Sequence, residues 1–211
     1  MTQLALYNQA LLILGERTLS ALTEENEFRR ALDIAWDSGA IVNRWLEQGL
    51  WNFSIRTTQQ EYQAGVEPDF GYLRAFTKPS DWVRTAMVCE DEYFNSPLTR
   101  YEDEQGFIFA DLDTIFLSYV SNDSAYGNDM SLWPSTFTRF CEYDLAVRIM
   151  KRATGLSLEE RDEIKKDHRR ALIDARSKDA MNEPARFPPR GSWSRSRQGR
   201  TSIAPNRSRW Y

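Results

Sequence analysis

The first fifty residues place apolar side chains at the spacing of amphipathic helices. Residues 3–14 are good helix formers and Gly15 is a natural stop, so the sequence predicts a first helix there. A second helix is predicted from Thr23 to about Gln48, with Gly49 as its C-cap, because acidic residues gather at its start. One broad face of this helix is expected to be buried, since its apolar residues recur at helical spacing. Those residues are Phe28, Ala31, Leu32, Ala35, Trp36, Gly39, Val42, Trp45 and Leu46.

From Trp51 the hydrophobic period becomes that of β-strands. Residues 51–56 alternate apolar and polar side chains, which is typical of a half-buried strand. Four further strand-like runs follow, and turns rich in glycine, proline and asparagine separate them. These runs cover residues 72–76, 83–88, 107–110 and 115–120. The middle third is therefore predicted to be a small antiparallel sheet inserted between helices.

Helical spacing returns after residue 133. Pro134 suits the first turn of a helix, and an apolar stripe follows it. The stripe consists of Phe137, Phe140, Cys141, Leu145, Val147 and Ile149. Ser157 and Glu160 form a capping box that opens a last helix, which runs to about Asp179. This helix is mostly charged, so we expect it to lie on the outside of the fold or against another polar surface. Its core-side candidates are Leu158, Ile164, Ala171, Leu172 and Ala175.

Together these elements predict an α+β fold in three parts. A helical bundle is expected from residues 1–50 and 130–180, an inserted antiparallel β-subdomain from residues 51–129, and an extended C-terminal arm from residues 181–211. Of the 211 residues, 41% are hydrophobic, which suffices for a buried core and excludes a disordered body. No apolar run approaches the roughly 18 residues of a membrane span, and the N-terminus lacks the features of a signal peptide. We expect a soluble protein made in the cytoplasm.

The formal net charge of −4 conceals a division along the chain. Residues 184–211 carry seven arginines, no lysine and no acid, whereas residues 1–183 hold 20 basic and 31 acidic side chains. The proline, serine, glycine and arginine of the arm cannot build a core, so it is expected to be extended or disordered alone. Its interleaved aromatic residues exceed what a solubilising tail requires. We therefore interpret it as an arm bound to a partner.

Three roles are open to this arm. Its arginines could neutralise phosphates while its aromatic side chains stack on bases. They could instead bind carboxylates through paired hydrogen bonds, with the aromatic side chains filling pockets of a partner protein. A plain cationic tail is the third role. The acidic body argues against a protein built mainly to coat nucleic acid. The candidate docking residues are Arg186, Phe187, Arg190, Trp193, Arg195, Arg197, Arg207, Trp210 and Tyr211.

The sequence offers little for catalysis, and we expect no enzyme activity, cofactor or metal. The single histidine, His168, lies on the charged last helix and is expected to be exposed. Cys89 and Cys141 are expected to be buried as small hydrophobic residues. Clustered carboxylates are a weak candidate for hydrolysis, which requires only two, and they fit solvated loops and strand edges as well. The clusters are residues 90–92, 102–104 and 111–113, with Glu104, Asp111 and Asp113 as the best candidates.

Several short motifs follow one another along residues 3–155. They are Leu4-Ala5-Leu6-Tyr7-Asn8-Gln9-Ala10-Leu11-Leu12-Ile13-Leu14-Gly15-Glu16, then Trp51-Asn52-Phe53, then Lys78-Pro79-Ser80-Asp81-Trp82-Val83-Arg84, then Leu132-Trp133-Pro134. Followed by a basic tail, this order of parts resembles the tail tubular protein A family, the head-to-tail adaptors of short-tailed bacteriophages.

The resemblance implies a structural virion protein of the tail or neck, without a catalytic site. Such adaptors form a ring, usually of twelve subunits, beneath the portal protein, and their helical bundles pack side by side. Their C-terminal arms reach the portal, while the β-rich part faces the nozzle or the tail fibres. DNA passes through the central channel without specific binding during ejection, and the acidic body suits such a channel. Two alternatives stay open: a DNA-binding virion accessory protein that uses the arm, and a carbohydrate-cleaving tail component.

Overall fold

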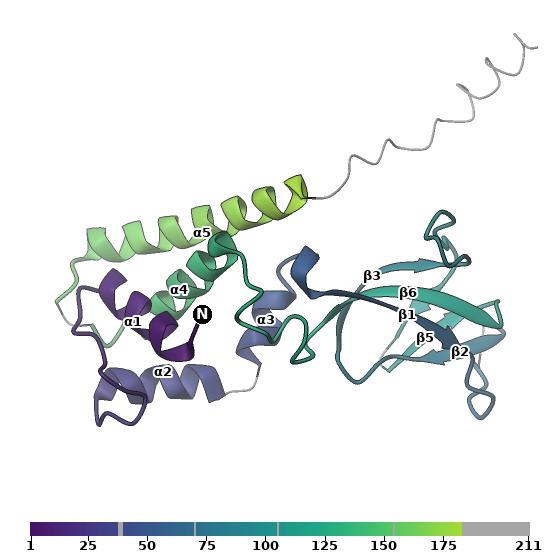
Figure 1. Cartoon of the computed structure of the whole chain (residues 1–211), viewed down its shortest axis with the longest axis horizontal. Coiled ribbons are helices and arrows are strands. Elements are labelled where there is room, and N and C mark those ends of the chain that lie inside the picture. The colour runs from purple at the N-terminus through teal and green to yellow at the C-terminus, as the bar shows by residue number, and fades with distance from the viewer. Residues whose placement is uncertain (38–39, 70, 105, 154, 183–211) are drawn as a thin grey trace, which may run out of the picture.

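The computed structural model describes residues 1–37, 40–69, 71–104, 106–153 and 155–182. Within these residues the chain forms helices at both ends of the sequence and antiparallel strands between them, which confirms the predicted α+β class. Figure 1 shows the helices gathered at one end of an elongated molecule and the strands at the other. We call these two regions the helical part and the β-part.

The helical part is built around one central helix. Its helices are α1 (Gln3–Ile13), α2 (Glu27–Asp37), α3 (Ile41–Leu46), α4 (Ser135–Ile149) and α5 (Leu158–Met181). Helix α4 packs against α1, α2 and α5, and α5 lies along the outside of it (Figure 1). Pro134 precedes α4, and the capping box of Ser157 and Glu160 opens α5, so both helix starts are confirmed within a residue or two.

Aromatic rings fill the core beneath α4. Phe137 lies 4.8 Å from Trp51 and 5.2 Å from Trp133 between ring centroids, and Trp45 lies 6.0 Å from Trp133. These edge-to-face contacts each add about 1 kcal/mol to the free energy of burying the rings. Trp45 and Trp51 are 1% exposed, so this cluster is the centre of the helical part.

The predicted single helix over residues 23–48 is wrong. The chain forms α2 and α3 instead of one helix. Helix α2 begins only at Glu27, because the polar side chains before it serve other contacts. Glu24 accepts hydrogen bonds from the backbone N–H and hydroxyl of Ser20, and Asn26 Oδ1 accepts from the backbone N–H of Phe28 at 2.8 Å. The sequence Ser38-Gly39 between the two helices has low helix propensity.

The β-part contains two sheets rather than the single sheet that the pattern predicted. Its strands are β1 (Ile55–Glu61), β2 (Arg74–Thr77), β3 (Trp82–Cys89), β4 (Glu102–Asp103), β5 (Phe107–Ala110) and β6 (Thr114–Ser121). Both sheets are antiparallel, with the orders β1-β6-β3 and β2-β5-β4. Four of the predicted runs are confirmed, within about two residues at each end.

The predicted strand over residues 51–56 is also wrong in its first half. Residues Asn52–Ser54 form a short 3-10 helix, and β1 begins only at Ile55. Trp51 is drawn into the helical core, where its Nε1 donates a hydrogen bond to the carbonyl of Trp45 at 3.1 Å. The backbone N–H and hydroxyl of Ser54 both donate to the Trp51 carbonyl, which closes the turn.

Strand β6 connects the two parts through its two faces. Ile115, Leu117 and Tyr119 alternate along it and pack with residues of the second sheet, such as Phe76, in a core of the β-part. Val120 belongs to the core of the helical part instead. The β-part therefore has its own small core and is joined to the larger helical core through the end of β6.

Candidate functional site

The docking residues predicted from the arm lie outside the described residues. They are Arg186, Phe187, Arg190, Trp193, Arg195, Arg197, Arg207, Trp210 and Tyr211. Their role stays a prediction, and so do the domain boundary at residue 181 and the form of the arm. The remaining candidates for a site are the polar clusters, cysteines and grooves of the described residues.

The acidic cluster over residues 111–113 is occupied by basic and backbone partners. The Asp113 carboxylate accepts a hydrogen bond from Arg74 Nε at 3.0 Å, and that guanidinium lies over the ring of Tyr62. Asp111 accepts from the backbone N–H of Leu73 at 3.0 Å and lies 3.4 Å from Arg100. These contacts give both carboxylates a structural task, since they hold Arg74, Arg100 and the backbone of Leu73 in place.

The acidic cluster over residues 102–104 forms an ion pair and hydrogen bonds with the segment that begins at Lys78. Lys78 Nζ forms an ion pair with Asp103, donates to the carbonyl of Glu104 and lies 3.8 Å from the centroid of the Trp82 ring. The second oxygen of Asp103 accepts from the Thr85 hydroxyl at 2.6 Å. The arrangement fixes the start of β3 against β4, which is a structural task for these residues.

A half-buried carboxylate, Asp144, connects three helices. Its Oδ2 accepts hydrogen bonds from Trp45 Nε1 of α3 and from Arg148 Nε of α4, both at 2.7 Å. Its Oδ1 lies 3.4 Å from His168 Nε2 of α5, a distance at which attraction is mainly electrostatic. Burial raises the pKa of Asp144, but the interactions with His168, Trp45 and Arg148 outweigh it and hold the pKa below its usual value.

The expectation that His168 is exposed is wrong. Its side chain is 23% exposed, and its ring stacks on Phe140 with centroids 5.5 Å apart. The charged residues around His168 in the sequence suggest an exposed position. Its burial could not be predicted because Asp144, which lies beside it, belongs to another helix. No serine or cysteine shares the contacts found for His168 in the described part of the chain, which gives it a place in helix packing.

Both cysteines are buried, as the sequence predicts, and no disulfide joins them. Burial raises the pKa of the Cys141 thiol well above its ordinary value, which keeps it protonated and unreactive. Among the described residues, no group of three or more histidine, cysteine, aspartate or glutamate side chains is arranged to hold a metal ion. Nor does any helix within residues 1–182 have the length and apolar character to cross a membrane.

A second half-buried carboxylate, Asp81, directly precedes β3. It accepts hydrogen bonds from Arg56 Nη1 at 2.9 Å and from the Tyr119 hydroxyl at 3.1 Å, and also from the hydroxyl of Ser121. Burial raises the pKa of Asp81, but the hydrogen bonds from Ser121, Arg56 and Tyr119 bring it below its usual value. Burial and the adjacent carboxylate raise the pKa of Tyr119 to about 12.

One surface feature combines apolar and acidic side chains. A groove of about 380 Å³ lies where the end of α1 meets the start of α5. Its apolar lining residues are Leu12, Ile13, Leu14, Tyr143, Leu156 and Ile164. Glu160, Glu163 and Asp167 of α5 line it as well. We call it the α1–α5 groove.

Sequence patterns do not find the α1–α5 groove. The periodicity of α1 assigns Leu12 to a helix but does not show that it is 56% exposed. Leu158, predicted on the core side of α5, is in fact 81% exposed. The charge pattern of α5 is the one available signal, since Glu159, Glu160 and Glu163 gather in its first turns.

The sequence was compared with protein-family models and with curated proteins. Neither the scan against protein-family models nor the search of curated proteins found a match.

Proposed function

We propose that the chain is a structural protein of a bacteriophage virion, a head-to-tail adaptor of a short-tailed phage. Copies assemble, after synthesis in the host cytoplasm, as a ring of about twelve subunits at the neck. The C-terminal arm docks on the portal protein, and the β-part faces the tail nozzle or fibres. DNA crosses the ring through its channel without specific binding. The order of motifs along residues 3–155 suggested this function.

One observation carries the proposal: the chain has two parts, each with a core, arranged end to end. The core of the helical part centres on Trp45 and Trp51, whereas the β-part packs Phe76 and Leu117 between its sheets. Figure 1 shows the two parts at opposite ends of the molecule. An adaptor between two assemblies requires such separate surfaces, held at a fixed distance.

Fixed polar contacts support this role by joining the two parts. Arg84 Nη1 of β3 donates to the carbonyl of Glu47 at 3.3 Å, and Asn122 Nδ2 donates to Asn43 Oδ1 at 2.9 Å. Trp133 Nε1 donates to the carbonyl of Gly127 at 2.9 Å, which holds the returning loop against the helices. These contacts stiffen the junction, as the transmission of force along a tail requires.

A change of all seven arginines in residues 184–211 to lysine tests the proposal in the full-length chain. The charge is kept, but lysine lacks the planar fork that binds a carboxylate through two hydrogen bonds. We expect the affinity for the portal ring of the same phage to fall by about tenfold or more, measured by mass photometry. The unchanged chain, in the same buffer, is the control.

The same variant separates the adaptor from its rivals. A DNA-binding accessory protein would bind duplex DNA with a steep dependence on salt, and the lysine variant would keep most of that affinity because the charge is unchanged. Salt-steep DNA binding without portal binding would contradict the adaptor role. A carbohydrate-cleaving component would release sugars from host polysaccharide and lose that activity in Asp111→Asn or Asp113→Asn.

A further inference from the structure

The α1–α5 groove is an apolar surface that has acidic side chains on one side. Leu12 is 56% exposed on the α1 side, and Ile164 is 8% exposed on the α5 side. Gly15, which also lines the groove, adopts a φ of +71° where the chain leaves α1, a conformation that favours glycine. An aromatic side chain could bury its ring there against leucine and isoleucine.

The acidic side of the groove has capacity to bind a cation. Glu160 already closes the capping box through Ser157, and Asp167 accepts a hydrogen bond from Arg170 at 3.2 Å. The Glu163 side chain, by contrast, makes no hydrogen bond or ion pair with any described residue, although it lines the groove. A segment that combined arginine with aromatic residues would match both the acidic and the apolar lining.

The chain itself contains such a segment. Residues 186–197 read Arg-Phe-Pro-Pro-Arg-Gly-Ser-Trp-Ser-Arg-Ser-Arg, with four arginines, two aromatic residues and no acid. We infer that residues 186–197 of one copy bind in the α1–α5 groove of a neighbouring copy. The arginines pair with Glu163 and the adjacent carboxylates, and Phe187 or Trp193 covers the apolar floor.

The charge along α5 favours a neighbouring copy over the same chain. Glu163 lies in the groove and Met181 ends α5 18 residues later, about 27 Å along the helix, where the arm follows. Between them α5 exposes basic side chains. These are Lys165, Lys166, Arg169, Arg170, Arg176 and Lys178. An arginine-rich segment that turned back along its own α5 would meet like charges.

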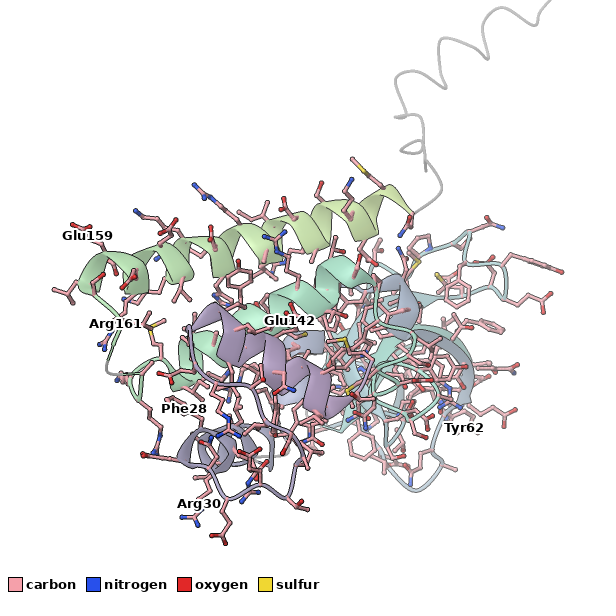
Figure 2. All side chains as sticks on the ribbon, turned by 60° about the vertical axis from the view of Figure 1, so that its left-hand side comes forward. Phe28, Arg30, Tyr62, Glu142, Glu159 and Arg161 are labelled. Atoms are coloured by element: carbon pink, nitrogen blue, oxygen red, sulfur yellow. The ribbon has the colours of Figure 1, made fainter. Side chains whose placement is uncertain are left out.

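The position of the groove also determines how the copies would associate. Glu159 and Arg161 mark the groove end of α5 in Figure 2, which lies away from Tyr62 and the β-part. The arm that follows the C-terminal end of α5 in one copy would then contact the groove near the N-terminal end of α5 in the next copy. Such a head-to-tail contact produces a ring when the rotation from copy to copy closes on itself. This contact rests on the proposed adaptor function and identifies what joins the copies of the ring. Residues 200–211 stay available to bind the portal.

Photo-cross-linking of the full-length chain without portal protein tests the inference. A photoreactive amino acid replaces Leu12, and ¹⁴N and ¹⁵N chains are mixed in equal amounts at high concentration and low salt. We expect cross-links from position 12 to residues 186–197, with about half of the linked peptide pairs joining a ¹⁴N to a ¹⁵N chain. Pairs of one isotope only would place the arm in the groove of its own chain and overturn the inference, as would the absence of links to residues 186–197.

A matched pair of charge reversals adds a second readout. Glu163→Lys is expected to reduce the mixed cross-links by about fivefold, because it replaces attraction by repulsion at a partly exposed site. Glu159→Lys, an exposed change one turn earlier on α5 and outside the groove, should leave them within twofold. Equal effects of both variants would mean that general charge attraction explains the contact, and would overturn the inference that the groove is the binding site. Since no portal protein is present, failure of this test is distinct from failure of the adaptor role.

Discussion

Asp144 in the helical part and Asp81 in the β-part are both half-buried carboxylates, and they have different kinds of partner. Asp144 of the helical part binds the side chains of Trp45, Arg148 and His168, which come from three helices. Asp81 of the β-part, which directly precedes β3, binds Arg56 of β1 and Ser121 of β6, the other two strands of the same sheet. The first carboxylate therefore fixes how whole helices pack, whereas the second stabilises one corner of a sheet. A change at Asp144 should act on the entire fold, and a change at Asp81 mainly on the β-part.

The largest effect is expected from Asp144→Ala. The change leaves the half-buried guanidinium of Arg148 and the buried indole N–H of Trp45 without their carboxylate, and the loss of both hydrogen bonds is expected to cost about 3 kcal/mol of unfolding free energy. Urea unfolding followed by tryptophan fluorescence measures it. Asp162→Ala, which removes an exposed ion pair with Lys165, should change the free energy by less than about 0.5 kcal/mol. Similar values for the two variants would contradict the central place of Asp144.

The next effect concerns the junction of the two parts. A Cβ added at Gly127 would lie 2.3 Å from the carbonyl oxygen of Ser121 and 2.7 Å from a methyl carbon of Leu46. Gly127→Ala should therefore push the β6 end and α3 apart and destabilise the protein by about 2 kcal/mol in thermal or urea unfolding. Gly65→Ala, with nothing within 4 Å of the added Cβ, is the control and should be neutral or slightly stabilising. A neutral Gly127→Ala would mean that the junction is loose.

A smaller effect is expected from Asp81→Asn, about 1 kcal/mol at pH 7, since Arg56 is partly exposed and its ion pair is screened by water. The folded pKa of Asp81 is depressed, so its contribution is present above the unfolded pKa near 4 and is lost as the pH falls through the folded pKa. The difference between wild type and variant should therefore shrink in acid. Hydrogen exchange should increase in the β-part and not in α4; an equal increase in both would contradict the local role of Asp81.

The smallest effect is spectroscopic. The Tyr119 hydroxyl has its pKa raised to about 12 by burial and by Asp81, so its ionisation should give a late step, well above pH 10, when absorbance is followed at 295 nm. The raised pKa stabilises the fold below pH ~10, and this contribution is lost between about pH 10 and 12. Tyr119→Phe should remove that late step and leave the rest of the titration unchanged. Persistence of the late step would assign it to another tyrosine.

Local signals predicted the parts of the fold that depend on neighbouring residues. The capping box of Ser157 and Glu160 and the stripe from Phe137 to Ile149 concern contacts within one helix, and both are confirmed. The short 3-10 helix at residues 52–54 was missed because it depends on Trp51 entering a core formed elsewhere in the chain. Tertiary contacts override a local alternation of apolar and polar side chains in such cases.

The candidate site was less predictable, for a related reason. Asp144 lies 99 positions from Trp45, and Asp81 lies 40 from Ser121, so no spacing rule connects either pair. The α1–α5 groove depends on how the end of α1 meets the start of α5, which sequence periodicity does not specify. Composition alone identified the arginine-rich arm, and its partner stays a prediction.

The mass of the full-length chain, alone and mixed with the portal ring of the same phage, tests the adaptor role most directly. The account predicts that the portal ring gains a fixed number of copies of the chain, about twelve, and stops there. A portal ring whose mass is unchanged at high concentrations of the chain would contradict it.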